Sequence, residues 1–218
     1  SSDWSSDVCS SDLRIVIIAF LIFTFYGAFP QDGNRSQDIR MMFYNVENLF
    51  DVTDDSLTSD EEFTPEGDRR WNQRKMYDKI HRIYKVIMAV GAWEPPAVIG
   101  LCEIENRFVL EQLVYETPLN DFGYRIIHHE SPDRRGIDVA LLYRDEFFLP
   151  LHDEAVPVSF PFDTSSATRD ILYVKGLLGG SEMIHIFANH WPSRYGGYLE
   201  TVGKRKQAAM VLKSKTDS

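Results

Sequence analysis

The pattern of apolar and polar positions predicts helices and strands from residue 39 onward. Over Trp71–Val90 the apolar side chains recur at helical spacing, and Gly91 is placed to end that helix. Ala97–Ile104 is instead a continuous apolar run, which is typical of a strand buried on both faces. The chain therefore contains both kinds of element.

Further segments with these patterns complete the expected order. Several predicted strands follow one another without a helix between them, so we expect an α/β fold with mixed strand connections. The strands are expected at Ile39–Val46, Tyr124–His128, Val139–Tyr143, Ile171–Leu178 and Met183–Asn189, and the helices at Arg107–Tyr115 and about Leu199–Lys213.

The beginning of the chain does not follow this pattern. Residues 1–13 repeat Ser-Ser-Asp and carry no folding signal, so we interpret them as a non-native leader, with a disordered linker as the alternative. One basic residue and an apolar run indicate a secretory signal peptide over residues 14–30. A linker over 31–38 and a partial domain over 39–218 would follow.

The apolar run is shorter than the roughly 20 residues that a membrane-spanning helix needs. Its end, Ala28-Phe29-Pro30, is not a small-x-small cleavage site, so an uncleaved membrane anchor is an alternative, and a buried core strand is a weaker one. We expect the rest of the protein to be secreted or periplasmic, with membrane contact only if the segment is not cleaved.

Composition and charge narrow the class of protein. An apolar content of 44% allows a sizeable core, and the formal net charge is −10. Proteins that coat nucleic acid are usually basic, because neutralising phosphates supplies most of their affinity. The acidic balance argues against such a protein, but an acidic phosphodiesterase remains open if a bound cation supplies local positive charge.

The two cysteines indicate neither a disulfide framework nor a zinc site. Cys9 lies in the leader, whereas Cys102 lies in the apolar run of a predicted strand. Since their contexts are unrelated, we expect no bridge between them.

Polar residues at the ends of predicted strands are the candidates for chemistry, because a rigid scaffold presents such positions to a shared cleft. Asn45 and Glu47 come after the run Met41–Tyr44 of the first strand, Glu103 ends the buried one, Arg169 opens another and His190 closes the last. Each residue type has a structural alternative: a strand end or helix cap for the glutamate, a turn former for the asparagine, a packed loop residue for the histidine and a surface pair for the arginine. Only the set together indicates a site.

Five segments in this order resemble the endonuclease/exonuclease/phosphatase family, which includes deoxyribonucleases, apurinic endonucleases, sphingomyelinases and inositol-polyphosphate phosphatases. Each segment is weakly specific alone, whereas five in the right order are strongly specific. They span roughly residues 39–213 and are Phe43-Tyr44-Asn45-Val46-Glu47-Asn48-Leu49-Phe50-Asp51, Gly100-Leu101-Cys102-Glu103-Ile104-Glu105-Asn106, Arg135-Gly136-Ile137-Asp138-Val139-Ala140-Leu141-Leu142-Tyr143, Thr168-Arg169-Asp170 and Asn189-His190-Trp191-Pro192-Ser193-Arg194.

The resemblance implies a four-layer α/β sandwich with two mixed sheets packed face to face, of which about the N-terminal two-thirds would be present. It also implies a secreted phosphodiesterase, most simply an endonuclease acting on DNA or RNA, with no stable protein partner. A phosphoesterase for a small or lipid phosphoester is the alternative, and a non-enzymatic binding module on the same fold is a third reading.

The resemblance also implies roles for four residues. Glu103 would be a carboxylate ligand to Mg²⁺, or to Mn²⁺ or Ca²⁺ in its place, and Asn45 would offer an amide oxygen near that metal or the scissile phosphate. His190 would hydrogen-bond the phosphate or transfer a proton, with a pKa near neutrality. Arg169 would donate two hydrogen bonds to a phosphate oxygen or orient a neighbouring catalytic group.

Three further residues would bind substrate on the same resemblance: Arg135, Asp138 and Arg194. The chemistry of their side chains alone assigns them no role. His128 and His129 could also face the cleft, but we expect a packed or solvated strand pair.

The family pattern includes two more segments, Gly-Asp-x-Asn and Asp-His, and neither is found after His190. We therefore expect this polypeptide to lack part of the catalytic machinery and to be inactive alone. We also expect it to lack the second sheet, which would expose more apolar surface than a soluble monomer normally tolerates and favour aggregation.

Overall fold

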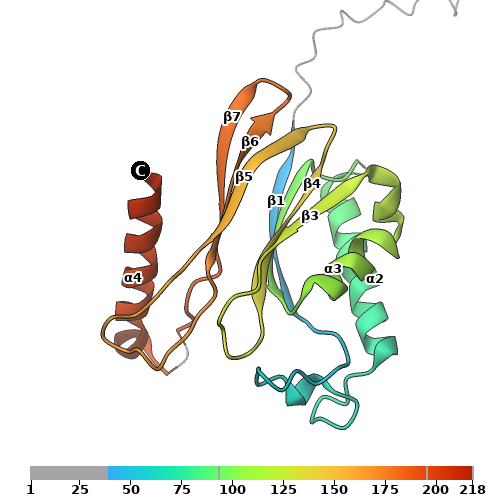
Figure 1. Cartoon of the computed structure of the whole chain (residues 1–218). Coiled ribbons are helices and arrows are strands. Elements are labelled where there is room, and N and C mark those ends of the chain that lie inside the picture. Colours follow the sequence, from blue (N-terminus) through green and yellow to red (C-terminus); the bar gives the residue numbers. More distant parts are fainter. Residues whose placement is uncertain (1–38, 93, 195, 218) are drawn as a thin grey trace, which may run out of the picture. The chain divides into compact units, whose positions relative to one another are not determined.

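Two β-sheets packed face to face, with helices on their outer sides, form the part of the chain that the computed structural model describes. These residues are 39–92, 94–194 and 196–217. The predicted leader, signal peptide and linker lie outside the described residues. Figure 1 shows the layers in order as helices α2 and α3, the first sheet, the second sheet and helix α4.

The first sheet has the strand order β1-β2-β4-β3, and its connections are mixed as expected. β1 and β2 are parallel neighbours, so the chain must cross over between them, and α2 makes this crossover. β4 is antiparallel to both of its neighbours. The bounds are β1 Met41–Leu49, α2 Gln73–Val90, β2 Val98–Ile104, β3 Tyr124–His128 and β4 Asp138–Arg144.

The second sheet is an antiparallel meander of three strands, in the order β5-β6-β7. Its bounds are β5 Phe148–Val156, β6 Ile171–Leu178 and β7 Glu182–Ala188, and α4 at Tyr198–Thr216 follows it. The remaining elements are the short helices η1 at Glu61–Phe63, α3 at Arg107–Tyr115 and η2 at Pro118–Phe122.

Helix α2 shows how the sequence sets these elements. Asn72 caps its first turn by accepting a hydrogen bond from the backbone N–H of Lys75 at 3.1 Å, and Gly91 ends it. Its buried side chains, Met76, Ile80, Ile83, Ile87 and Met88, recur at helical spacing and pack against the first sheet.

Three apolar layers hold the fold together. The first lies between the helices and the first sheet, and includes Ile99, Leu101, Ile104, Leu110 and Leu142. The second lies between the two sheets, where residues of the opposite face, such as Val98, Cys102 and Leu141, meet Phe148 and Val174. The third joins α4 to the outer face of the second sheet through Ala208, Phe160 and Ile171. Because β2 contributes to two layers, its continuous apolar run is explained.

The four-layer α/β sandwich is confirmed, but one expectation about it is wrong. We expected the chain to lack the second sheet, whereas β5, β6 and β7 cover the inner face of the first. The resemblance led us to expect that sheet from the missing part of the family pattern; β6 and β7 were expected as strands but not as this sheet, and β5 was not predicted. Its residues are mostly exposed or half-buried, and it contains Pro150, a residue that sheets tolerate at an edge strand such as this one.

Within the described residues, no helix combines the length and apolar character that crossing a membrane requires. The thiol of Cys102 is free and buried, and burial raises its pKa to about 12, so it remains protonated at neutral pH.

We expect Phe148→Ala to lower the free energy of unfolding by about 3–5 kcal/mol, because the ring is fully buried between the sheets and packs edge-on against Tyr143 at a centroid distance of 5.8 Å. The neighbouring Leu149 is exposed, so Leu149→Ala should change it by less than about 0.5 kcal/mol. Urea unfolding followed by circular dichroism measures both. Equal losses in the two variants would contradict the sheet packing described here.

Candidate active site

Glu103 is presented by an irregularity in β2. Cys102 and Ile104 pair with consecutive residues of β4, so Glu103 is an extra residue between them, and its φ of +63° is in the left-handed region. β1 is irregular at the same level, where Glu47 and Asn48 also have positive φ. The bulge turns the Glu103 side chain out of the regular alternation of the strand and leaves it partly accessible.

Asn45 holds this carboxylate. Its Nδ2 donates a hydrogen bond to Glu103 Oε1 at 3.0 Å, while its Oδ1 accepts one from the backbone N–H of Glu47 at 2.8 Å. The amide nitrogen, rather than the oxygen, therefore faces Glu103. In this arrangement Asn45 supports the carboxylate, and the second N–H of its amide group can donate to an incoming oxygen.

His190 reaches the same point from the second sheet. It follows β7, and its Nε2 lies 3.4 Å from Glu103 Oε1. Burial and the nearby Arg169 guanidinium lower the imidazole pKa to about 4, outweighing the attraction of Glu103. The ring is neutral at pH 7, and its pKa lies below the near-neutral value expected from the sequence. The structure thus brings together Asn45, Glu103 and His190.

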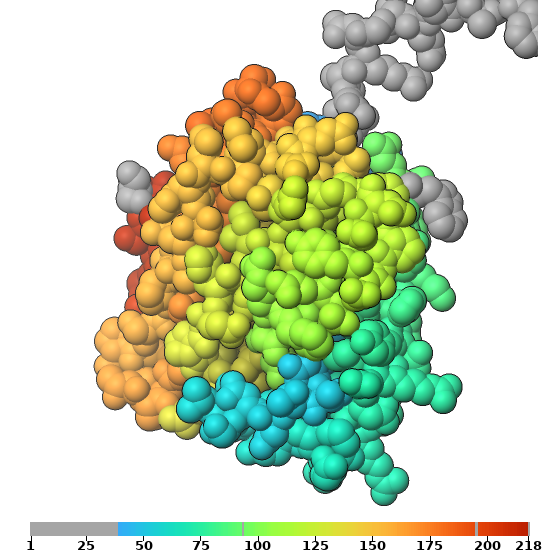
Figure 2. All heavy atoms as spheres, turned by 45° about the vertical axis from the view of Figure 1, so that its right-hand side comes forward, coloured from blue at the N-terminus to red at the C-terminus, as the bar shows by residue number. Residues whose placement is uncertain are grey.

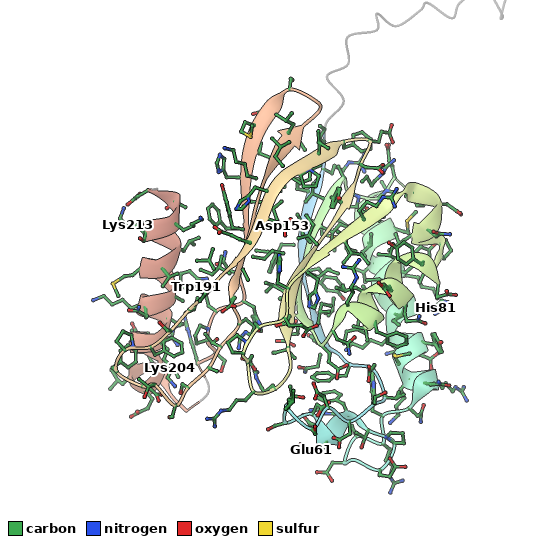
Figure 3. The ribbon with its side chains drawn as sticks, in the orientation of Figure 1. Glu61, His81, Asp153, Trp191, Lys204 and Lys213 are labelled. Atoms are coloured by element: carbon green, nitrogen blue, oxygen red, sulfur yellow. The ribbon has the colours of Figure 1, made fainter. Side chains whose placement is uncertain are left out.

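The Arg169 guanidinium does not point at these three side chains, because it donates hydrogen bonds to backbone carbonyl oxygens of the loop after β7. Nε and Nη2 donate to the carbonyl oxygen of His190 at 3.1 and 2.7 Å, and Nη2 also donates to that of Trp191 at 2.8 Å. Figure 3 labels Trp191 in this loop. Of the two roles considered for Arg169, the geometry supports the orientation of the histidine-bearing loop.

The partner of Arg169 is Asp133, which lies in the turn before β4 and was not among the residues predicted for the site. Arg169 Nη1 donates to Asp133 Oδ2 at 2.8 Å, and both side chains are about 95% buried. Burial alone would raise the pKa of Asp133, but hydrogen bonds from Arg135 and Arg169 outweigh it and lower that pKa.

The residues expected to bind substrate lie in three different settings. Arg135 is half-exposed and donates to Asp133 at 3.2 Å, so it lies at the edge of the site. Asp138 is buried, and its Oδ1 accepts the backbone N–H of Ser131 at 2.9 Å. This burial does not match a substrate contact. Arg194 is exposed in the loop between β7 and α4.

His128, the last residue of β3, and His129, which follows it, lie in different surroundings. His129 pairs with Asp153 of β5 at 2.7 Å near the surface, and Figure 3 shows Asp153 on that strand. The side chain of His128 is buried and lies near Asp138. One histidine is packed and the other is partly solvated, which agrees with the expectation that they do not face the cleft as a pair.

Two ionisable groups near Glu103, Lys79 and Glu105, were not identified from the sequence as part of the site. Lys79 of α2 donates from Nζ to the carbonyl oxygen of Glu47 at 2.6 Å, and burial lowers its pKa despite the nearby Glu47 and Glu103 carboxylates. Glu105 is buried two residues after Glu103. Burial and repulsion by acidic neighbours raise its pKa to about 8, although it accepts a hydrogen bond from Asp51 N–H at 2.5 Å. It is therefore mostly protonated at pH 7.

The donors at this site suit a magnesium-like cation. Mg²⁺ binds oxygen, retains several waters and commonly uses only one or two protein carboxylates together with substrate phosphates. Glu103 offers such a carboxylate at a partly accessible position. Asn45, whose oxygen is already hydrogen-bonded, would support that ligand in this arrangement.

Residues 40–218 match the sequence profile described as the Endonuclease/Exonuclease/phosphatase family. A search of curated proteins found no match.

The chain is similar to several solved structures at low sequence identity. Humanized D. rerio TDP2 is 14% identical with a TM-score of 0.52, over 83% of this chain and 57% of that one. A Bacteroides vulgatus endonuclease/exonuclease/phosphatase is 16% identical with a TM-score of 0.49, over 81% and 59%. A Bacteroides thetaiotaomicron mannosyl-6-phosphatase is 13% identical with a TM-score of 0.49, over 82% and 59%. The matched part spans less than two-thirds of each of these chains.

We expect Asp133→Asn to lower the free energy of unfolding at pH 7 by about 3–5 kcal/mol, because it leaves the Arg169 charge buried without its partner. The pKa of Asp133 is lowered in the fold, so this stabilisation is present above the unfolded pKa near 4 and is lost as pH falls through the folded pKa. The difference between wild type and variant should therefore shrink below about pH 4.

Urea titrations at neutral and acidic pH measure this difference. Asp145→Asn is the matched control, since it breaks the exposed pair of Asp145 with Arg125 and should change stability by at most about 1 kcal/mol. A loss from Asp133→Asn no larger than that of the control would argue against the buried pair.

Proposed function

The chain belongs to the endonuclease/exonuclease/phosphatase family, and from this premise we propose that the protein is a divalent-metal-dependent phosphodiesterase that hydrolyses DNA or RNA. The observation that carries the proposal is the convergence of Asn45, Glu103 and His190, which come from β1, β2 and the end of β7. Asn45 lies where the regular pairing of β1 with β2 is interrupted, Glu103 lies near the end of β2 and His190 follows β7. Such breaks and ends of strands are places where a scaffold presents catalytic groups.

Each side chain has a role that its surroundings support. Glu103 would hold the cation, which when bound supplies polarisation of a phosphoryl oxygen. The neutral imidazole of His190 can donate a hydrogen bond to a phosphate oxygen from one nitrogen. Asn45 can donate from its second amide N–H, and Arg169 fixes the backbone that carries His190. These donors would stabilise charge that develops on the phosphate.

A second candidate is the hydrolysis of a small or lipid phosphoester. The net charge of −10 favours it, because a polyanion such as DNA is repelled by an acidic surface. One solved structure with the same fold is named a mannosyl-6-phosphatase. The chemistry at Glu103 would be the same for either substrate.

We also propose that the protein acts outside the cytoplasm. The support is the basic residue and apolar run over residues 14–30, which have the composition of a secretory signal.

We expect Glu103→Gln to reduce phosphodiester hydrolysis by at least about a hundredfold, because it removes the charged cation ligand. The assay is nicking of plasmid DNA with Mg²⁺, and chelation by EDTA should abolish it. The assay uses the full-length protein. Glu111→Gln, which changes an exposed residue of α3 paired with Arg107, should retain wild-type activity.

Parallel assays with an inositol phosphate and with sphingomyelin separate the two candidates. Hydrolysis of one of these without nicking of DNA or RNA would replace the nuclease proposal by the second. Activity that persists in both EDTA and the Glu103→Gln variant would refute the metal-dependent site.

A further inference from the structure

A second group of possible metal ligands lies where β3 ends and β4 begins. It consists of His128, Glu130 and Asp138, and one ligand atom from each lies within 4.8 Å of the others. None of these residues belongs to the group formed by Asn45, Glu103 and His190. The group combines an imidazole with two carboxylates, so it is more than a collection of acidic side chains.

The centre of this group is buried and incompletely satisfied. The side chains of His128 and Asp138 are both 3% exposed. His128 Nε2 lies 3.3 Å from Asp138 Oδ2 but makes no hydrogen bond of acceptable geometry, and Ser131 Oγ beside them has no hydrogen-bond partner either. A buried polar atom without a partner is unfavourable, and a bound cation would satisfy the imidazole nitrogen.

The spacing suits zinc. Zinc bonds of 2.0–2.1 Å in a tetrahedral arrangement place two ligand atoms roughly 3.3 Å apart, and the two buried atoms are 3.3 Å apart. The backbone N–H of Ser131 fixes Asp138 by donating to its other oxygen at 2.9 Å, as is common for carboxylate ligands. A nitrogen and two oxygens are a ligand set that transition metals accept more readily than magnesium does.

Charge favours a cation at the same point. The carboxylates of Asp138 and Asp55 both repel that of Glu130. The Glu130 side chain is 69% exposed, so it can turn toward an ion that enters from solvent.

We propose that His128, Glu130 and Asp138 bind a zinc ion at a site separate from Glu103. The ion would stabilise the turn between β3 and β4. This turn contains Asp133, which forms the ion pair with Arg169. This turn also accepts a hydrogen bond at Arg134 O from Ser59 N–H in the loop after β1, and Figure 2 shows that loop in cyan along the lower edge of the molecule. The inference does not rest on the proposed hydrolase function.

The test is titration of the metal-stripped chain with Zn²⁺ by calorimetry, with Co²⁺ as a spectroscopic probe. We expect a site of one equivalent and a visible Co²⁺ spectrum of tetrahedral type. Asp138→Asn, His128→Gln and Glu130→Gln should each weaken Zn²⁺ binding by at least about tenfold. His129→Gln, which changes the neighbouring solvent-accessible histidine, and Glu103→Gln should leave it unchanged.

A loss of Zn²⁺ binding in Glu130→Gln cannot be attributed to misfolding, because this side chain is largely exposed and its substitution should not disturb the fold. Circular dichroism verifies that each variant is folded. No Zn²⁺ binding by wild type overturns the proposal, as does binding that survives Glu130→Gln and His128→Gln. Binding lost in Glu103→Gln but kept in Glu130→Gln would place the ion at the other site and would likewise overturn it.

Discussion

Asp133 and Arg169 lie in segments that lead into different sheets, and they meet in a buried ion pair on which the geometry of the site depends. Asp133 lies in the turn that leads into β4, while Arg169 lies two residues before β6, and the same guanidinium holds the carbonyl oxygens of His190 and Trp191. Three segments that are distant in the sequence are thereby fixed to one another. Burying two charges is unfavourable unless their hydrogen bonds are satisfied, and here each guanidinium nitrogen finds an acceptor.

The charges around Glu103 are more balanced than the acidic composition indicates. Glu105 is mostly protonated at pH 7 because burial and acidic neighbours raise its pKa, so it adds little negative charge there. Lys79 brings a cation from α2, and Arg169 contributes another. Glu103 thus lies near groups of both signs, although the whole chain carries a net charge of −10.

The sequence predicts elements and strand ends well, and partnerships poorly. Apolar runs and helical spacing identify β2 and α2, since burial on both faces or on one face leaves a direct pattern. Glu103 and His190 meet near the ends of their strands, as expected, whereas Asn45 lies inside β1, where its pairing with β2 is interrupted. The edge strand β5 leaves no such pattern, because its exposed residues are not selected for burial. Likewise, a turn aspartate does not reveal that it will face an arginine 36 residues later, since only tertiary packing decides this.

The left-handed residues beside the site have an energetic meaning of their own. Glu47 and Glu103 adopt a conformation that glycine accepts freely, and such positions typically cost about 1–3 kcal/mol each. Stability alone would therefore favour glycine there, at the expense of the carboxylate. A strained glutamate that the surrounding sheet holds in place has already lost much of its conformational freedom before any ligand arrives. The fold thereby gives up some of its own stability to hold a carboxylate that would need little reorganisation to bind a cation.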